Sequence, residues 1–459
     1  MQLFAESVLL AGGWARNVVI DVVEDGLITH ISRDVKRQPR SAQAITGPVI
    51  PGVPNLHSHA FQRALAGHCE RRGPGDDDFW TWRQSMYDFV SRVTPEQVQS
   101  IAEQLYVEML KAGYTAVAEF HYLHHDRNGQ PYSNLTEMSD RIIAAAQSTG
   151  IAVTLLPVLY AHDGFGGKPP ASGQRRFVND IERYAQLLQA LFRHYGNHGN
   201  IRIGAAAHSL RAVNPELLQQ MVEALDGLDA AAPIHIHIAE QQKEVSECEA
   251  WCGQRPLAWL FDNIGVDRRW CLVHATHVVD GEMQRLAASG AVAGLCPTTE
   301  ANLGDGLFPA VAYLHGGGTF GVGSDSHVSV SPAEELRWLE YGQRLLHQRR
   351  ALLTRGGSPS VGAGLYKHAV EGGAQACGLA GGGLAVGKRA DLVVLDPHAP
   401  VLIDKHEDLL LDAFVFAGNR NVIKDVMVGG RWRVVDARHV REDEILGRFR
   451  EALNQLATP

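Results

Sequence analysis

The stretch of sequence that decides the fold is Pro54-Asn55-Leu56-His57-Ser58-His59-Ala60-Phe61-Gln62, and an apolar run from Pro48 leads into it. This pattern is typical of a buried strand that runs out into a polar loop. Residues two apart in a strand point the same way, so His57 and His59 can turn both imidazoles toward one point at the end of the strand. Such a pair can bind one metal ion, although an ordinary polar loop can carry two histidines as well.

Similar polar groups follow later apolar runs of the chain. They are His237-Ile238-Ala239-Glu240, His274 and Ser324-Asp325-Ser326. The apolar runs span residues 48–56, 114–120, 151–160, 201–207, 233–239, 270–275, 291–296 and 319–324. Helical patterns of roughly 12 to 20 residues separate the runs. Eight strands that alternate with helices predict a closed parallel barrel, in which the catalytic groups lie at the carboxyl ends of the strands.

Both chain ends carry a β pattern of a different kind. Alternating runs on either side of Asp25-Gly26 predict one hairpin, and Gly429-Gly430 predicts another. We therefore predict an α/β fold, a (β/α)8 TIM-like barrel with a small β-sandwich domain built from both chain termini. The expected parts are residues 1–48 and 385–440 for the β-sandwich, 49–384 for the metal-dependent barrel, and 441–459 for a C-terminal helix.

The composition limits the classes of partner. The chain has 459 residues, of which 45% are hydrophobic, and a net charge of -9 from 42 basic and 51 acidic residues. Because no basic stripe is present, we expect a small-molecule substrate and neither nucleic acid nor a membrane as partner. The N-terminus has no basic region of a secretory signal, and no apolar stretch reaches the roughly 18 to 20 residues that span a bilayer, so we expect a cytoplasmic protein. The six scattered cysteines predict reduced packing residues.

The polar residues at the strand ends fit a metal centre. In a closed barrel the ends of the strands meet at one mouth, so His57, His59, His237 and Asp325 can converge there. Three imidazoles and one carboxylate suit Zn²⁺, and iron or manganese can also accept such ligands. A site of this kind lowers the pKa of bound water from 15.7 to about 7. Glu240 can move the protons of that water without being a ligand, although a carboxylate at a helix N-terminus is the alternative interpretation.

The order of these motifs resembles the amidohydrolase superfamily, in its mononuclear deaminase branch, over almost the whole chain. The shared set is H-x-H after strand one, H-x-x-E after strand five, His after strand six, S-D after strand eight, and the terminal G-K-x-A-D-L-V-V-L-D. More narrowly, the chain is similar to the formimidoylglutamate deiminases of bacterial histidine degradation in the segments Asn55–Gln62, Phe79–Arg83, Glu119–Tyr122, His208–Arg211 and His235–Gln241.

The resemblance implies a reaction and a set of site residues. The reaction is the metal-dependent hydrolysis of N-formimino-L-glutamate, a small dicarboxylate, to N-formyl-L-glutamate and ammonia. The implied metal ligands are His57, His59, His237 and Asp325, and the implied catalytic residues are Glu240, His274 and Asp325. The implied substrate contacts are Gln62, Arg83, Tyr122, His208 and Arg211. The resemblance also implies a homodimer.

A single zinc ion per subunit is expected, because barrels of this superfamily with two metals usually need a bridging lysine on a middle strand. Between residues 60 and 300 the only lysines are Lys111, Lys168 and Lys243, and none lies in an apolar run.

Several alternatives remain open at this point. Arg83 and Arg211 could each bind a substrate carboxylate through two hydrogen bonds. However, Arg83 could instead pack on Trp80 or Trp82, Arg211 could be an outward-facing loop charge, and Tyr122 could be a packing residue at the rim. A deaminase of a nucleobase, a nucleoside or an adenosyl thioether would need the same metal site, and a barrel without catalysis could act as a binding protein. The glycine-rich loop at 164–173 is predicted to be a mobile cover, although a static loop has the same composition.

Overall fold

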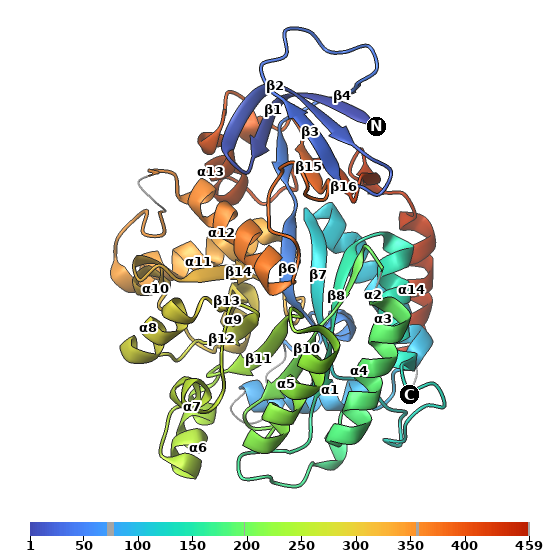
Figure 1. The fold of residues 1–459 in the computed structure, drawn as a ribbon, viewed down its shortest axis with the longest axis vertical. Coiled ribbons are helices and arrows are strands. Elements are labelled where there is room, and N and C mark those ends of the chain that lie inside the picture. The colour runs from blue at the N-terminus through green and yellow to red at the C-terminus, as the bar shows by residue number, and fades with distance from the viewer. Residues whose placement is uncertain (71–77, 197, 355–357, 458–459) are drawn as a thin grey trace.

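The computed structural model of the protein describes residues 1–70, 78–196, 198–354 and 358–457. A ring of parallel strands forms its centre, in the order β14-β13-β12-β11-β10-β8-β7-β6, with β9 paired to β8 (Figure 1). These strands are β6 (Val53–Ser58), β7 (Tyr114–His121), β8 (Ala152–Leu159), β9 (Ile201–Ile203), β10 (Ala205–Ser209), β11 (Ile234–Ile238), β12 (Trp270–His274), β13 (Val292–Leu295) and β14 (Thr319–Val322).

The first and last strands of the ring meet just beyond their carboxyl ends. Ser58 and Asp325 form a parallel bridge. The amide of His59 donates to the carbonyl of Asp325 at 3.2 Å, and the amide of Asp325 donates to the carbonyl of His57 at 3.0 Å. The two backbones approach so closely that a Cβ atom on Gly323 would lie 2.8 Å from the His57 Cβ. The predicted (β/α)8 barrel is therefore confirmed, and its junction lies between the H-x-H and S-D segments.

Strands from both chain ends build a second sheet at the top of Figure 1. It has nine strands in the order β18-β17-β16-β15-β5-β1-β2-β3, with β4 paired to β1. The predicted turn at Gly429-Gly430 joins β16 to β17 with φ angles of 55° and 73°, which glycine adopts without strain. The strands are β1 (Gln2–Leu10), β2 (Gly13–Val22), β3 (Ile28–Ser32), β4 (Gln43–Ile45), β5 (Val49–Pro51), β15 (Leu392–Leu395), β16 (Ile423–Val428), β17 (Arg431–Val435) and β18 (Arg438–His439).

Helices surround the barrel, and sequence signals explain where they begin. α2 starts after Thr94, which forms a reciprocal capping box with Gln97, and Pro95 occupies its first position. The helices are α1 (Phe79–Val90), α2 (Pro95–Lys111), α3 (Glu137–Thr149), α4 (Ile181–Tyr195), α5 (Pro215–Asp229), α6 (Gln242–Cys252), α7 (Pro256–Asn263), α8 (Asp280–Ser289), α9 (Pro297–Leu303), α10 (Ala310–His315), α11 (Pro332–His347), α12 (Val361–Ala376), α13 (Asp408–Phe416) and α14 (Glu442–Ala457).

The first predicted run, 48–56, serves both sheets. Its first part, β5, pairs with β1 and β15 in the terminal sheet, whereas β6 begins the barrel. The chain changes sheet at Gly52, where a Cβ atom would lie 2.2 Å from the side chain of Thr115. The fourth run is also divided, into β9 and β10. Hydrophobic periodicity does not show either division, because the residues on both sides are equally buried.

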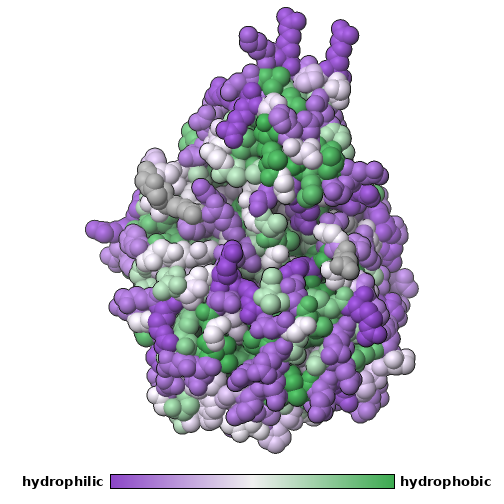
Figure 2. Space-filling model, viewed as in Figure 1, coloured by the Kyte–Doolittle hydropathy of each residue, from purple (hydrophilic) through white to green (hydrophobic). Residues whose placement is uncertain are grey.

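The surface is mixed in character. Figure 2 shows a largely hydrophilic face with a hydrophobic area over the terminal sheet at the top of the view. Among the residues that the structure describes, no helix combines the length and the apolar character needed to span a membrane.

Candidate active site

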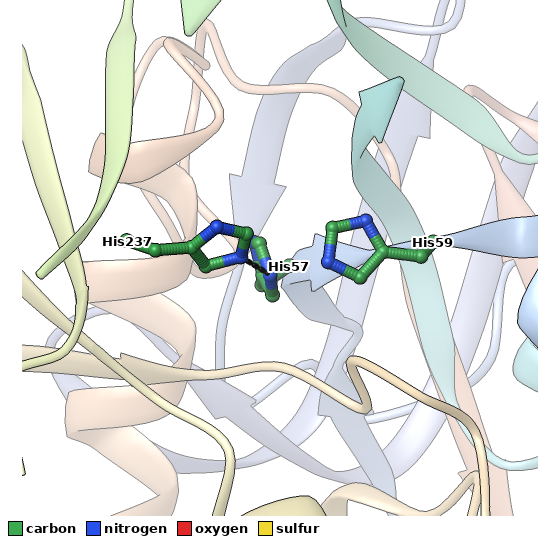
Figure 3. A group of neighbouring side chains, drawn as sticks. All are labelled: His57, His59 and His237. Carbon is green, nitrogen blue, oxygen red and sulfur yellow. Dashed lines mark hydrogen bonds between the residues drawn. The ribbon is translucent and has the colours of Figure 1, made fainter. Parts of the chain in front are cut away.

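Three histidines from two barrel strands meet at the carboxyl end of the ring. His57 lies in β6, His59 directly follows it, and His237 lies in β11. Figure 3 shows His59 and His237 approaching from opposite sides, with His57 between them. The Nε2 atoms of His57 and His237 are 2.9 Å apart. All three side chains are at most 6% exposed.

Backbone carbonyls fix the tautomers of two of these rings. Nδ1 of His59 donates to the carbonyl of Phe120 at 3.0 Å, and Nδ1 of His237 donates to the carbonyl of His208 at 2.9 Å. The Nε2 lone pairs of both rings therefore face the centre of the group. Burial lowers the pKa of His59 and of His237, and lowers that of His57 to about 3. Neutral imidazoles are the form that binds a metal ion.

Asp325 completes this group from the segment after β14. Its Oδ1 atom lies 3.5 Å from Nε2 of His57 and 3.3 Å from Nε2 of His59. Burial acts to raise the pKa of Asp325, but the hydrogen bond from His57 and the interactions with the rings of His57, His59 and His274 lower it below its usual range. The residue is therefore a carboxylate at neutral pH.

The donor set fits one divalent ion. The three imidazole nitrogens and the carboxylate oxygen each lie within 4 Å of at least one other member, and lone pairs so close together repel one another unless a cation lies among them. Three nitrogens and one oxygen are a ligand set that zinc accepts, and water or substrate can take a further position.

Glu240 and His274 form a second pair beside this group. Oε1 of Glu240 lies 3.8 Å from Nε2 of His274, and Nδ1 of His274 donates to Glu300 at 3.2 Å. Burial by itself would lower the pKa of His274, but the charges of Glu240, Glu300 and Asp325 outweigh burial and raise it to about 10. His274 is therefore protonated at neutral pH. Burial raises the pKa of Glu240, although the charges of His274 and Arg211 oppose the increase.

The alternative interpretation of Glu240 as a helix-capping carboxylate does not match the geometry. Glu244 takes that place, because its carboxylate accepts the amides of Ala239 and Glu240 at 3.0 and 3.2 Å. The Glu240 side chain is thereby left to face the cavity and His274.

The backbone is strained at the strand ends that carry these groups. Ala239, His274 and Asp325 have positive φ angles of 49°, 67° and 45°. Such conformations cost about 1 to 3 kcal/mol for a residue with a side chain and persist only where the surroundings enforce them. Here they turn the side chains of three different strands toward one cavity.

The cavity in front of the histidines is lined by all the sequence-predicted site residues except His57. The predicted residues that line it are His59, Gln62, Arg83, Tyr122, His208, Arg211, His237, Glu240, His274 and Asp325. Sequence reasoning missed seven further lining residues, which are Phe79, Trp82, Met86, Tyr87, Tyr160, Phe177 and Leu303.

Two arginines bring fixed positive charge to this cavity. Arg211 is 5% exposed and lies 4.0 Å from the buried carboxylate of Glu244, so it is not an outward-facing loop charge. Its Nε atom, the atom nearest Glu244, is buried without a hydrogen-bond partner. Arg83 lies in α1. Its guanidinium packs over Trp80, 4.6 Å from the ring centre, and also lines the cavity, so the two interpretations of Arg83 are compatible.

Neutral polar groups line the rest of the cavity. Nε2 of Gln62 donates to the hydroxyl of Tyr122 at 2.9 Å, while Oε1 of Gln62 has no partner and can accept a hydrogen bond. Burial and the charge of Arg211 lower the pKa of His208 well below its usual value. The His208 ring packs against Tyr160, with ring centres 4.6 Å apart. Tyr160 and its aromatic neighbours carried no sequence signal that separates them from core residues.

Comparisons with known proteins agree with this geometry. The amidohydrolase family model matches residues 49–433. A formimidoylglutamate deiminase of Pseudomonas aeruginosa is 54% identical over 99% of both chains. A 5-methylthioadenosine/S-adenosylhomocysteine deaminase of Natronomonas pharaonis is 28% identical and aligns with 86% of this chain and 82% of its own.

A solved structure shows the same fold over the whole length. The crystal structure of an amidohydrolase from Brucella melitensis superimposes with a TM-score of 0.94 at 48% identity, covering 99% of both chains. Since the family model matches most of the chain and the relatives align along nearly its whole length, the chain belongs to the amidohydrolase family.

Proposed function

We propose that the protein hydrolyses N-formimino-L-glutamate to N-formyl-L-glutamate and ammonia with one zinc ion per subunit. The observation that carries this proposal is the pairing of two arginines with the histidine group in one cavity. The substrate has a formamidine-like head and two carboxylates, so it needs hydrolytic groups and fixed cations in the same site. The relative at 54% identity, a formimidoylglutamate deiminase, supports the same substrate.

In the proposed reaction, the oxygen of water forms a bond to the formimino carbon, and the imino nitrogen leaves as ammonia with both protons of that water. His57, His59, His237 and Asp325 would hold the metal ion, which supplies Lewis-acid activation of water at neutral pH. Glu240 accepts a proton from the water and passes it to the departing nitrogen. Protonated His274 lies within 3.8 Å of Glu240 and stabilises its carboxylate form.

The remaining lining residues bind and orient the substrate. Arg211 and Arg83 bind its carboxylates, so the formimino carbon is held beside Glu240. The free Oε1 of Gln62 accepts a hydrogen bond from a nitrogen of the formimino group. Tyr122 fixes the orientation of the Gln62 amide through their hydrogen bond. Neutral His208 forms another part of the cavity wall.

The test is a parallel assay of ammonia release from formiminoglutamate, guanine and adenosine. We expect release from formiminoglutamate alone. The aromatic residues Phe79, Trp82, Tyr87 and Phe177 in the wall could stack on a purine, and the 28% identical relative is an adenosyl thioether deaminase. A purine would, however, leave both arginines without an anionic partner in the cavity. Turnover of a purine without turnover of formiminoglutamate would replace the proposal.

The proposal includes a homodimer, which the resemblance to formimidoylglutamate deiminases supports. Light scattering of the purified protein should give twice the chain mass of 50.1 kDa. A mass equal to one chain would remove this part of the proposal without affecting the reaction.

A further inference from the structure

A chain of buried polar side chains runs along the junction of β6 and β14. It begins at Asn55, whose Nδ2 donates to Oγ of Ser324 at 2.6 Å. Ser324 lies 2.9 Å from Nδ1 of His327, and Nε2 of His327 lies 3.2 Å from Oγ of Ser58. Ser58 then donates to Oε2 of Glu119 in β7 at 2.6 Å. All five side chains are at most 1% exposed.

When Glu119 is ionised, one arrangement of protons gives every donor in this chain an acceptor. Asn55 Nδ2 is always a donor, and the Glu119 carboxylate is an acceptor. Ser324 therefore donates to Nδ1 of His327, His327 donates from Nε2 to Ser58, and Ser58 donates to Glu119. The Glu119 carboxylate ends the sequence and fixes the tautomer of His327.

Glu119 also holds the turn that follows the H-x-H segment. Its Oε1 atom accepts the amide of Ala60 at 2.7 Å. Together, its two oxygens contact Ser58 and Ala60, the residues on either side of His59. Two other members of the hydrogen-bonded chain, Ser324 and His327, lie before and after Asp325 in the sequence. None of the five residues lines the cavity.

We propose that Glu119 is a positioning residue, which through Ser58 and His327 holds the H-x-H segment of β6 against the Asp325 segment of β14 in the register that a metal ion needs. The two segments supply three of the four proposed ligands and are otherwise joined by backbone hydrogen bonds from His59 and Asp325. Partners of metal ligands typically contribute 10- to 100-fold to metal affinity. The inference rests on the proposed metal site but not on the proposed substrate.

The experiment compares Glu119→Gln and Ser58→Ala with wild type. Glutamine keeps the shape of Glu119, but its NH2 group cannot accept the hydrogen bonds that the carboxylate accepts from the Ala60 amide and from the hydroxyls of Ser58 and Tyr106. Alanine at position 58 removes the central link and little volume. Zinc affinity is measured by competition with a chelator, and the visible absorption of the cobalt-loaded protein reports the ligand geometry.

The matched control is Glu340→Gln. Glu340 is also fully buried and accepts two backbone amides, from Leu352 and Leu353, at 3.0 Å each. It also pairs with Arg344 at 2.6 Å, but it lies in α11 and contacts no proposed ligand. This control separates the loss of a buried carboxylate in general from the loss of the Glu119 chain.

We expect Glu119→Gln and Ser58→Ala each to weaken zinc binding by about tenfold or more and to alter the cobalt spectrum. The double variant should bind zinc no more weakly than the single variant with the lower zinc affinity, because both changes break the same hydrogen-bonded chain. Wild-type zinc affinity and cobalt spectra in both variants, with only lower unfolding temperatures, would show that Glu119 serves the fold alone. Equal zinc loss in Glu340→Gln would overturn the proposal too. Wild-type protein that binds no zinc would refute the metal site itself, whatever the substrate assay shows.

Discussion

Glu240 stands 3.8 Å from a protonated histidine and faces the cavity, and these contacts determine what its removal should do. In Glu240→Gln the neutral amide cannot accept a proton from water. We expect turnover to fall by about 10²-fold or more, with metal content unchanged. Ammonia release and metal analysis check the result. The control is Glu247→Gln, which changes a more exposed carboxylate on the same side of the barrel, in α6. A Glu240→Gln protein with wild-type turnover and bound metal would leave Glu240 without a role in catalysis.

Arg211 should separate recognition of the substrate from the hydrolytic step. A substrate carboxylate several bonds from the formimino carbon gains no charge during the reaction. The arginine that binds this carboxylate therefore acts by binding and positioning the substrate. Loss of one partner of a buried ion pair costs about 2 to 5 kcal/mol, so Arg211→Met should lower kcat/KM at least about tenfold.

The controls for Arg211→Met are a substrate and a variant. Slow hydrolysis of formamidine, which has no carboxylate, should hardly change, and zinc content should stay constant. Arg202→Met removes an arginine whose ion pair with Asp229 lies outside the cavity, and it should retain wild-type kinetics. If Arg211→Met slowed both substrates equally, Arg211 would support the fold or the metal site instead.

At this scale, the sequence predicts residues whose chemistry is unusual at a strand end. His57, His59 and His237 are of this kind, because a buried imidazole at the mouth of a barrel has few structural uses. Tyr160 and Phe177 line the same cavity but look like core residues in the sequence. Glu119 belongs to a motif shared with the formimidoylglutamate deiminases, but the sequence gives no separate indication of its role. Its role depends on Ser58, which is 61 residues away in the sequence. Through Ser58 it also depends on His327, which is 269 residues from that serine.

At the scale of elements, the loop at 164–173 illustrates a prediction that is still open. Phe165 is 7% exposed and stacks on Trp251 of α6, with ring centres 5.5 Å apart. A loop that covers the cavity should release this contact when it opens. We therefore expect amide exchange at 164–173 to slow when N-formyl-L-glutamate binds. Exchange that is equally slow with and without this ligand would identify a static loop.

The contact of β18 with α3 should make stability depend on pH. His439 is 3% exposed, donates from Nε2 to the carbonyl of Thr149 at 2.9 Å, and accepts the amide of Arg441 at Nδ1 at 3.1 Å. Burial lowers its pKa below the usual 6.5. The unfolded chain therefore binds this proton more readily, and the contribution of His439 to stability is present above pH 6.5 and is lost as the pH falls.

The variant that tests this pH dependence is His439→Gln. Glutamine offers the same donor and acceptor as neutral histidine but does not titrate. Urea unfolding at about pH 7.5 and about pH 5.5 should show a smaller loss of stability on acidification in the variant than in wild type. An identical loss in both proteins would assign the pH dependence to other groups.

Which sheet a strand joins could not be predicted from the strand itself. The eight apolar runs were located correctly, since hydrophobic periodicity is a local property. The division of the first run into β5 and β6 depends on pairing with β1, β15 and β7, which are far apart in the sequence. Similarly, a helix at Arg83 follows from the Asp78 cap and tertiary packing, whereas its aromatic residues favour no single structure.

At the scale of the whole molecule, a bound metal ion would connect β6, β11 and the segment after β14, and so bridge the junction of the barrel. Removal of zinc by a chelator should therefore lower the unfolding temperature. Zinc at 100 times its dissociation constant adds about 2.7 kcal/mol of stability.

The change in amide exchange on removal of zinc should be larger along β6 and β14 than along β8. The control is Mg²⁺, which prefers oxygen ligands and should not restore the loss. A uniform change along the barrel would mean that the ion does not act at the junction.

The junction of β6 and β14 has a further consequence during synthesis of the protein. The ribosome delivers the H-x-H segment first and Asp325 much later, at about 5 to 20 residues per second. For on the order of ten seconds or more, the nascent chain therefore carries two exposed histidines and the unpaired edge of β6. The terminal sheet can be completed only later, because β5 pairs on one side with β1 and on the other with β15, which is synthesised after Asp325. The set of four proposed metal ligands is therefore complete only when Asp325 has been made, late in synthesis.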